Sequence, residues 1–147
     1  MKKIIGCLLI SFMIIAACNS SQDKDESVAK TQTQTSNDGV FFVNLADNAI
    51  VKSPVFVEMG VKGMDVEPAG EINPGKGHHH IIIDGNSEEE GMMVPADSTH
   101  IHYGKGQTSD SLLLSPGKHT LTLQFANGFH QSYGKDWSKT ISITVEE

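Results

Sequence analysis

Polar and apolar residues alternate most clearly in His119-Thr120-Leu121-Thr122-Leu123-Gln124-Phe125. Successive side chains of a β-strand point to opposite faces, so Leu121, Leu123 and Phe125 share one face and the polar residues share the other. The sequence Ser115-Pro116-Gly117-Lys118 comes directly before it and is typical of a tight turn, with Pro and Gly at the two central positions. The pattern predicts a strand that enters from a turn and buries its Leu/Phe face in a core.

Strand-like segments recur on both sides of this stretch, and no segment shows a sustained helical period. Turn residues separate six further predicted strands, at residues 40–45, 55–61, 78–84, 100–103, 111–114 and 139–145. Short strands of this number and spacing favour an all-β fold, an antiparallel immunoglobulin-like β-sandwich of about seven strands over residues 40–147. A β-barrel is the alternative architecture.

The chain begins with the features of a secretory signal. Met1-Lys2-Lys3 is basic, Ile4 to Ile15 is apolar but short for a membrane span, and Ala16-Ala17-Cys18 follows. This ending resembles the bacterial lipobox, which implies that residues 1–17 are a lipoprotein signal peptide, cleaved before a lipid-modified Cys18. The alternative is an ordinary signal peptide in which the cysteine occurs by chance.

Residues 18–39 form a polar segment without apolar periodicity, and they predict a lipidated, disordered tether. Its acidic run at residues 22–26 resembles the surface-export signal of Bacteroidetes-type lipoproteins, although a solvated charged linker would look the same. The expected location is the bacterial cell envelope, in the outer membrane or at the cell surface rather than in the inner membrane. The lipid anchor would supply the membrane contact, and several acyl chains together anchor a protein stably.

Charge and cysteine content narrow the function further. The net charge is −7, and removal of Lys2 and Lys3 with the signal would make it −9, which argues against nucleic acid as a partner. Cys7 would leave with the signal and Cys18 would be acylated. The folded domain would then contain no disulfide and no thiolate ligand. We expect it to be a monomer.

Histidine is concentrated in one part of the chain, because five of the seven histidines lie between Gly77 and Gly106. His78 and His80 share one strand face, and His100 and His102 share a face of another strand. Two such pairs on neighbouring strands would place four imidazoles around one point, an arrangement that suits copper or zinc. A thioether from Met64, Met92 or Met93 would favour Cu(I), whereas a blue-copper site is excluded because it requires a thiolate.

A structural role for the histidines is the competing interpretation. Histidines beside glycine-rich loops often donate to backbone carbonyls and thereby order the loop. His79 alternates with Ile81 and Ile83 and is a candidate core residue, His119 is a candidate cap after its turn, and His130 is isolated. The protein would then be a non-catalytic surface binding or adhesion module with an unidentified protein or glycan partner. An enzyme is the least supported class, because the sequence shows no nucleophile–base pair.

Four motifs occur in a specific order: Gly63-Met64-Asp65 with the glycine-rich loop after it, Gly77-His78-His79-His80, His100-Ile101-His102-Tyr103-Gly104-Lys105-Gly106-Gln107, and Pro116-Gly117-Lys118-His119. Together they resemble the bacterial family called domain of unknown function 4399, over about residues 40–145. The resemblance implies a secreted or lipid-anchored domain without an established activity. It supports the location of a site at Met64, the triple histidine, His100, His102 and His119, and it implies no reaction.

Overall fold

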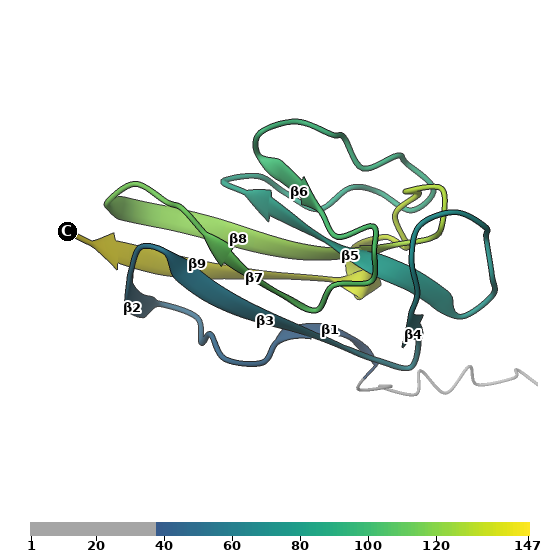
Figure 1. Ribbon diagram of the computed structural model, residues 1–147, viewed down its shortest axis with the longest axis horizontal. Coiled ribbons are helices and arrows are strands. Elements are labelled where there is room, and N and C mark those ends of the chain that lie inside the picture. The colour runs from purple at the N-terminus through teal and green to yellow at the C-terminus, as the bar shows by residue number, and fades with distance from the viewer. Residues whose placement is uncertain (1–37) are drawn as a thin grey trace, which may run out of the picture. The chain divides into compact units, whose positions relative to one another are not determined.

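A computed structural model describes residues 38–147, which form two packed β-sheets (Figure 1). The smaller sheet contains, in spatial order, β1 (Gly39–Phe42), β3 (Val55–Lys62) and β7 (Ser109–Leu112). The larger sheet contains, in spatial order, β2 (Ala49–Lys52), β9 (Ser138–Glu146), β8 (Gly117–Ala126), β5 (Lys76–Ile83) and β4 (Asp65–Val66), and β6 (His100–His102) also pairs with β5.

The predicted β-sandwich is confirmed, and each of the seven predicted strands is present within a few residues of its expected bounds. Two short strands were not predicted, β2 and β4, and they pair parallel to β9 and β5 respectively. The prediction of a wholly antiparallel fold was therefore incomplete. Strands of four and two residues are too short for alternation to distinguish them from loop.

The core lies between the sheets and depends on the pairing of β5 with β8. The register places Ile81 opposite Leu123 and His79 opposite Phe125 on the inner face. Leu121, Leu123 and Phe125 are fully buried, as their alternation predicts, and they belong to the same apolar cluster as Val57 and Met59 of β3. Leu123 is at the centre of this layer, because β8 has β5 on one side and β9 on the other.

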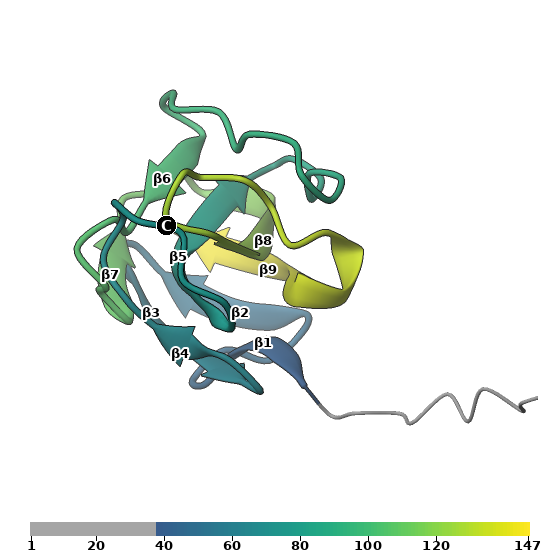
Figure 2. The same cartoon turned by 90° about the vertical axis from the view of Figure 1, so that its right-hand side faces the viewer.

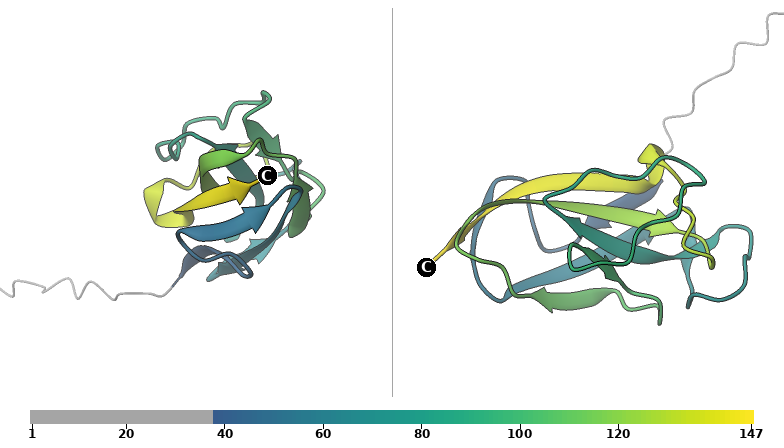
Figure 3. Two further views of the ribbon diagram at one scale, coloured as in Figure 1. Left: turned by 90° about the vertical axis from the view of Figure 1, so that its left-hand side faces the viewer. Right: turned by 90° about the horizontal axis from the view of Figure 1, so that it is seen from above.

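The outer face of the larger sheet is also covered, although side chains there point away from the core. The loop between β5 and β6 and the segment between β8 and η1 (Lys135–Trp137) lie on the side opposite the small sheet (Figures 1 and 2). Seen from above, the β5–β6 loop crosses the large sheet (Figure 3). Both strand faces of β5 are consequently buried.

The short η1 helix is the only helix among residues 38–147, and none there is long and apolar enough to span a membrane. The predicted signal peptide at 1–17 and Cys18 lie outside the described residues, as does the predicted tether at 18–39 up to residue 37.

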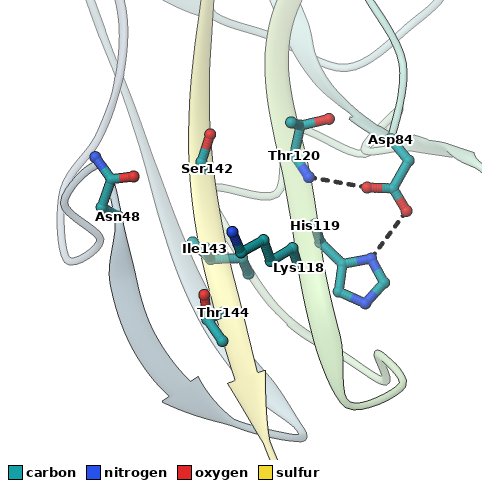
Figure 4. A pocket seen from close by; sticks show the side chains of 8 residues that line it. All are labelled: Asn48, Asp84, Lys118, His119, Thr120, Ser142, Ile143 and Thr144. Atoms are coloured by element: carbon teal, nitrogen blue, oxygen red, sulfur yellow. Dashed lines mark hydrogen bonds and ion pairs between the residues drawn. The ribbon is translucent and has the colours of Figure 1, made fainter.

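His119 confirms the sequence-based interpretation of a cap after the turn. Its Nδ1 is 2.8 Å from Asp84 Oδ2, and its Nε2 is 3.0 Å from the Ser115 carbonyl oxygen. Figure 4 shows this pair at the edge of a pocket of about 320 Å³ over β8 and β9. Asp84 Oδ1 also accepts the Thr120 N–H at 2.8 Å. Both ring nitrogens face acceptors, so the ring has no nitrogen left for a ligand and joins the end of β5 to the start of β8.

The central position of Leu123 gives a test of the core. Leu123→Ala should lower the free energy of unfolding by about 2–5 kcal/mol, because the substitution leaves a cavity where the side chain is fully buried. Leu113→Ala is the matched control, since Leu113 is 85% exposed and its loss should cost less than about 0.5 kcal/mol. Urea denaturation of the two variants measures the difference, and equal midpoints would contradict this account of the core.

The His119–Asp84 pair predicts a pH-dependent contribution to stability. The hydrogen bond to Asp84 raises the pKa of His119 above 6.5. Desolvation raises the pKa of Asp84, but the bonds from Thr120 and His119 outweigh it and leave that pKa below 3.8. The His119 contribution is therefore complete below pH 6.5 and is lost as pH rises through the folded pKa. The Asp84 contribution is complete above pH 3.8 and is lost as pH falls through its folded pKa.

Wild-type protein should thus exceed His119→Gln in stability most clearly between pH 3.8 and 6.5, and the difference should shrink at alkaline pH. Urea unfolding of both proteins at about pH 5 and about pH 9 measures it. Both proteins contain the same other histidines, so the difference in stability between them reports on His119 alone. A difference that does not change with pH would show that the pair does not act in this way.

Candidate metal centre

His78 and His80 come from the middle of the large sheet. Both lie on the outer face of β5, because His79 and Ile81 face the core. Gly77 precedes them at a point of close approach, since a Cβ there would collide with the Ala126 carbonyl oxygen of β8. This contact holds β5 tightly against β8 where the histidines begin. Both rings are almost inaccessible to solvent, with His78 0% and His80 1% exposed.

His102 reaches the same face from the neighbouring strand. β6 pairs with β5 so that His102 is directly opposite His80. The two rings are stacked with centroids 5.0 Å apart, as expected for side chains paired across two strands. Gly104 leaves room for the His102 ring, because a Cβ at that position would overlap its Cε1 and Nε2 atoms. His102 is exposed, so it forms the solvent side of the group.

His130 joins the group from the turn after β8. Its backbone has φ 65°, a left-handed conformation that few residues other than glycine adopt. The Asn127 side chain holds this turn, since its Oδ1 accepts the Phe129 and Gln131 N–H groups at 2.9 and 3.1 Å. Gly128 fits against the backbone of Glu71, where a Cβ would collide with the carbonyl oxygen. The constrained turn directs the His130 ring to the outer face of β5.

The four imidazoles meet at one place. The ring centroids of His78, His80, His102 and His130 are 4.5–5.9 Å apart, and two nitrogen pairs, His78 Nε2–His80 Nε2 and His102 Nε2–His130 Nε2, are each 3.0 Å apart. One ligand atom from each of His78, His80 and His102 lies within 4.8 Å of the others. These three histidines could therefore hold a metal ion.

Two of the nitrogen separations already suit coordination, whereas the widest one requires movement of a ring. Two nitrogens bound to one ion at about 2.05 Å are about 2.9 Å apart at a right angle and about 3.3 Å apart at the tetrahedral angle. The two 3.0 Å pairs fall in that interval. The widest separation within the trio, 4.8 Å, must close by about 0.7 Å for ligands on opposite sides of an ion and by about 1.5 Å for tetrahedral ligands. Rotation of the exposed His102 ring supplies such a movement.

Burial keeps the two inner imidazoles, those of His78 and His80, neutral at ordinary pH. Desolvation, together with the neighbouring histidines, lowers the pKa of His78 to about 4. The same causes, with desolvation again the largest, lower the pKa of His80 well below its usual value. Desolvation and then His130 also lower the pKa of His102. A neutral imidazole keeps the lone pair that binds a metal ion, so protons compete weakly at this site.

The buried histidines are the unsatisfied polar groups of this face. Gln124 and Thr122, which are fully buried beside them, each have several hydrogen bonds, including those from Gln124 to the Gly134 carbonyl and from Thr122 to the Gly85 carbonyl. In contrast, Nδ1 of His78 and Nδ1 of His80 have no partner among the described residues. Neither ring donates to a backbone carbonyl, which is the contact that the structural interpretation requires.

The sequence-based site is thus brought together in part. His78, His80 and His102 converge, but His100 does not join them, although it lies on the same face of β6. Its Nδ1 is 2.8 Å from Asp97 Oδ1, and this bond lowers the pKa of Asp97 below its usual range. His130 contributes the fourth ring of the group instead, although the ligand atoms that lie within 4.8 Å of one another come only from His78, His80 and His102. No pattern in the sequence indicated His130, since the turn that carries it also packs against Glu71 and pairs with Val94, both far away in the chain.

Of the remaining candidate residues, only Met93 lies beside the four histidines. His79 is fully buried on the core face and packs against Phe125 with ring centroids 5.0 Å apart, so its predicted place in the core is confirmed. Neither of its ring nitrogens has a hydrogen-bond partner among the described residues, so the expectation of a satisfied core histidine is wrong. Met64 is partly buried against the apolar core. Met93 is different, because it lines a pocket of about 310 Å³ together with His80, His102 and His130. Met92 does not line this pocket.

The comparisons with known proteins agree with the resemblance of the motifs. The model of the family described as Domain of unknown function (DUF4399) matches residues 57–146, a segment that contains all four clustered histidines. A search of curated proteins and a search of solved structures each found no match. The matched segment is more than half of the chain, and the chain therefore belongs to the DUF4399 family.

Proposed function

We propose that this protein binds a transition metal ion, copper or zinc, through His78, His80, His102 and His130. The observation that carries the proposal is the convergence of four imidazole rings from β5, β6 and the turn after β8. Three of them, His78, His80 and His102, offer ligand atoms close enough together to hold a metal ion. A chance cluster of buried histidines is costly, because a polar group that loses water without gaining a partner is destabilising. A bound metal ion would accept the imidazole lone pairs and offset this cost.

The chemistry of the donors limits the metal. Imidazole nitrogen suits zinc and copper better than magnesium or calcium, which prefer oxygen ligands. No carboxylate belongs to the cluster of ligand atoms found among the described residues. One side of the cluster opens into the 310 Å³ pocket, through which an ion can enter. His78 and His80 would form the rigid base of the site, and His102 and His130 its outer half.

Metal titration of the purified protein tests the proposal. One equivalent of Zn(II), Cu(II) or Cu(I) should bind, and free metal at about 100 times its Kd should stabilise the fold by about 2.7 kcal/mol. His102→Ala and His130→Ala should each weaken binding by at least about tenfold, since each removes a nitrogen ligand. Both residues lie at the accessible side of the cluster, so these variants should retain the fold.

His100→Ala is the matched control, because His100 has the same residue type on the same strand but pairs with Asp97. It should bind metal with the affinity of the wild type. If none of the three ions stabilises the wild type, the proposal is wrong. That result would favour the alternative of a non-catalytic surface binding or adhesion module whose histidines are structural.

We also propose that the chain is a lipoprotein of the bacterial cell envelope, anchored at Cys18. The support is the order of basic, apolar and small residues before this cysteine. In cells, the protein should fractionate with membranes and incorporate labelled palmitate, and Cys18→Ser should lose the label and be released from the membrane. Cys7→Ser is the control and should behave like the wild type. Incorporation of label into Cys18→Ser would exclude this anchor.

A further inference from the structure

The pocket beside the four histidines has one soft donor in its lining. His80, His102 and His130 line it together with the segment Met93-Val94-Pro95-Ala96. The Met93 sulfur is the only sulfur atom among the residues that line this pocket. The other wall residues are apolar or imidazole, so no second ligand competes with the thioether for the open side of the cluster.

The backbone of Met93 is fixed next to His130. Met93 forms an isolated antiparallel bridge with Gln131, the residue after His130. Two hydrogen bonds flank this bridge, from the Val94 N–H to the His130 carbonyl at 2.9 Å and from the Ser132 N–H to the Met92 carbonyl at 2.8 Å. Val94 is buried, which secures the segment against the sheet. The Met93 segment is therefore part of the folded structure and is held next to the turn that carries His130.

The Met93 side chain is largely exposed to solvent, although its backbone is held. It is 65% exposed, whereas Val94 beside it is 3% exposed. An unbranched thioether has three rotatable bonds, so it can turn toward the histidines without movement of the main chain. The other methionines of the described residues do not combine an exposed side chain with a place in the lining of this pocket. Met59 is buried in the core, Met64 packs against the core, and Met92 is exposed but does not line the pocket.

We propose that Met93 is a thioether ligand that closes the site on Cu(I), so that the centre selects cuprous copper over Zn(II). This inference rests on the metal binding proposed above. Thioether sulfur is a soft ligand that selects Cu(I), whereas Zn(II) binds well to imidazoles alone. The predicted domain lacks a thiol, so a methionine beside the histidines is the soft donor available for this discrimination.

Competitive titration of the purified protein tests this assignment, with a chromogenic Cu(I) chelator under anaerobic reducing conditions and with a fluorescent Zn(II) chelator. Met93→Leu keeps the apolar bulk and removes the sulfur. It should weaken Cu(I) binding by at least about tenfold and change Zn(II) binding by less than about threefold. Met92→Leu is the matched control, and it should leave both affinities at the wild-type values.

X-ray absorption at the copper edge supplies a second measurement. Cu(I)-loaded wild type should show a copper–sulfur distance that is absent from Met93→Leu and retained in Met92→Leu. Equal Cu(I) affinity of wild type and Met93→Leu, or no copper–sulfur distance in the wild type, would overturn the Met93 assignment while leaving histidine-based metal binding in place. If the wild type binds neither Cu(I) nor Zn(II), the Met93 assignment is wrong, and if it also fails to bind Cu(II), the proposal of metal binding is wrong as well.

Discussion

The rest of the structure depends on the register between β5 and β8. This pairing places Ile81 and His79 toward Leu123 and Phe125 in the core, and it thereby turns His78 and His80 to the opposite face. A shift of one residue would exchange these two sets, because side chains alternate strictly along a strand. The apolar core thus fixes the orientation of the two histidines that form the base of the site. Close approach at Gly77 supports the same register from the start of the strand.

Two loop segments complete the site on the outer face of β5. The segment at Met92–Val94 pairs with the segment at His130–Ser132 through backbone hydrogen bonds, and together they cover the outer face of β5. The cover excludes water from His78 and His80 and lowers the pKa of each. It also leaves a pocket beside the exposed His102. A site with a rigid, desolvated base and an accessible outer half suits an ion that must enter from solvent.

The seven histidines have three different roles in the fold. His100 and His119 each pair with an aspartate, and His79 fills the core. Only His78, His80, His102 and His130 have rings that meet one another. A count of histidines along the chain therefore overstates the size of the cluster, and residue spacing alone does not identify its members.

Most of the strand content could be predicted from the amino-acid sequence, because alternation in segments such as His119 to Phe125 depends only on local side-chain geometry. The sequence also determined the family and the pair His78 and His80, whose shared face follows from their spacing. The tertiary structure decided the other half of the site. His100 satisfies the same spacing rule as His102, but its ring is engaged by Asp97 three residues earlier. His130 enters because a left-handed turn, held by Asn127 and packed on Glu71, directs its ring to β5. Contacts between residues far apart in the chain decide this placement, and no local pattern encodes them.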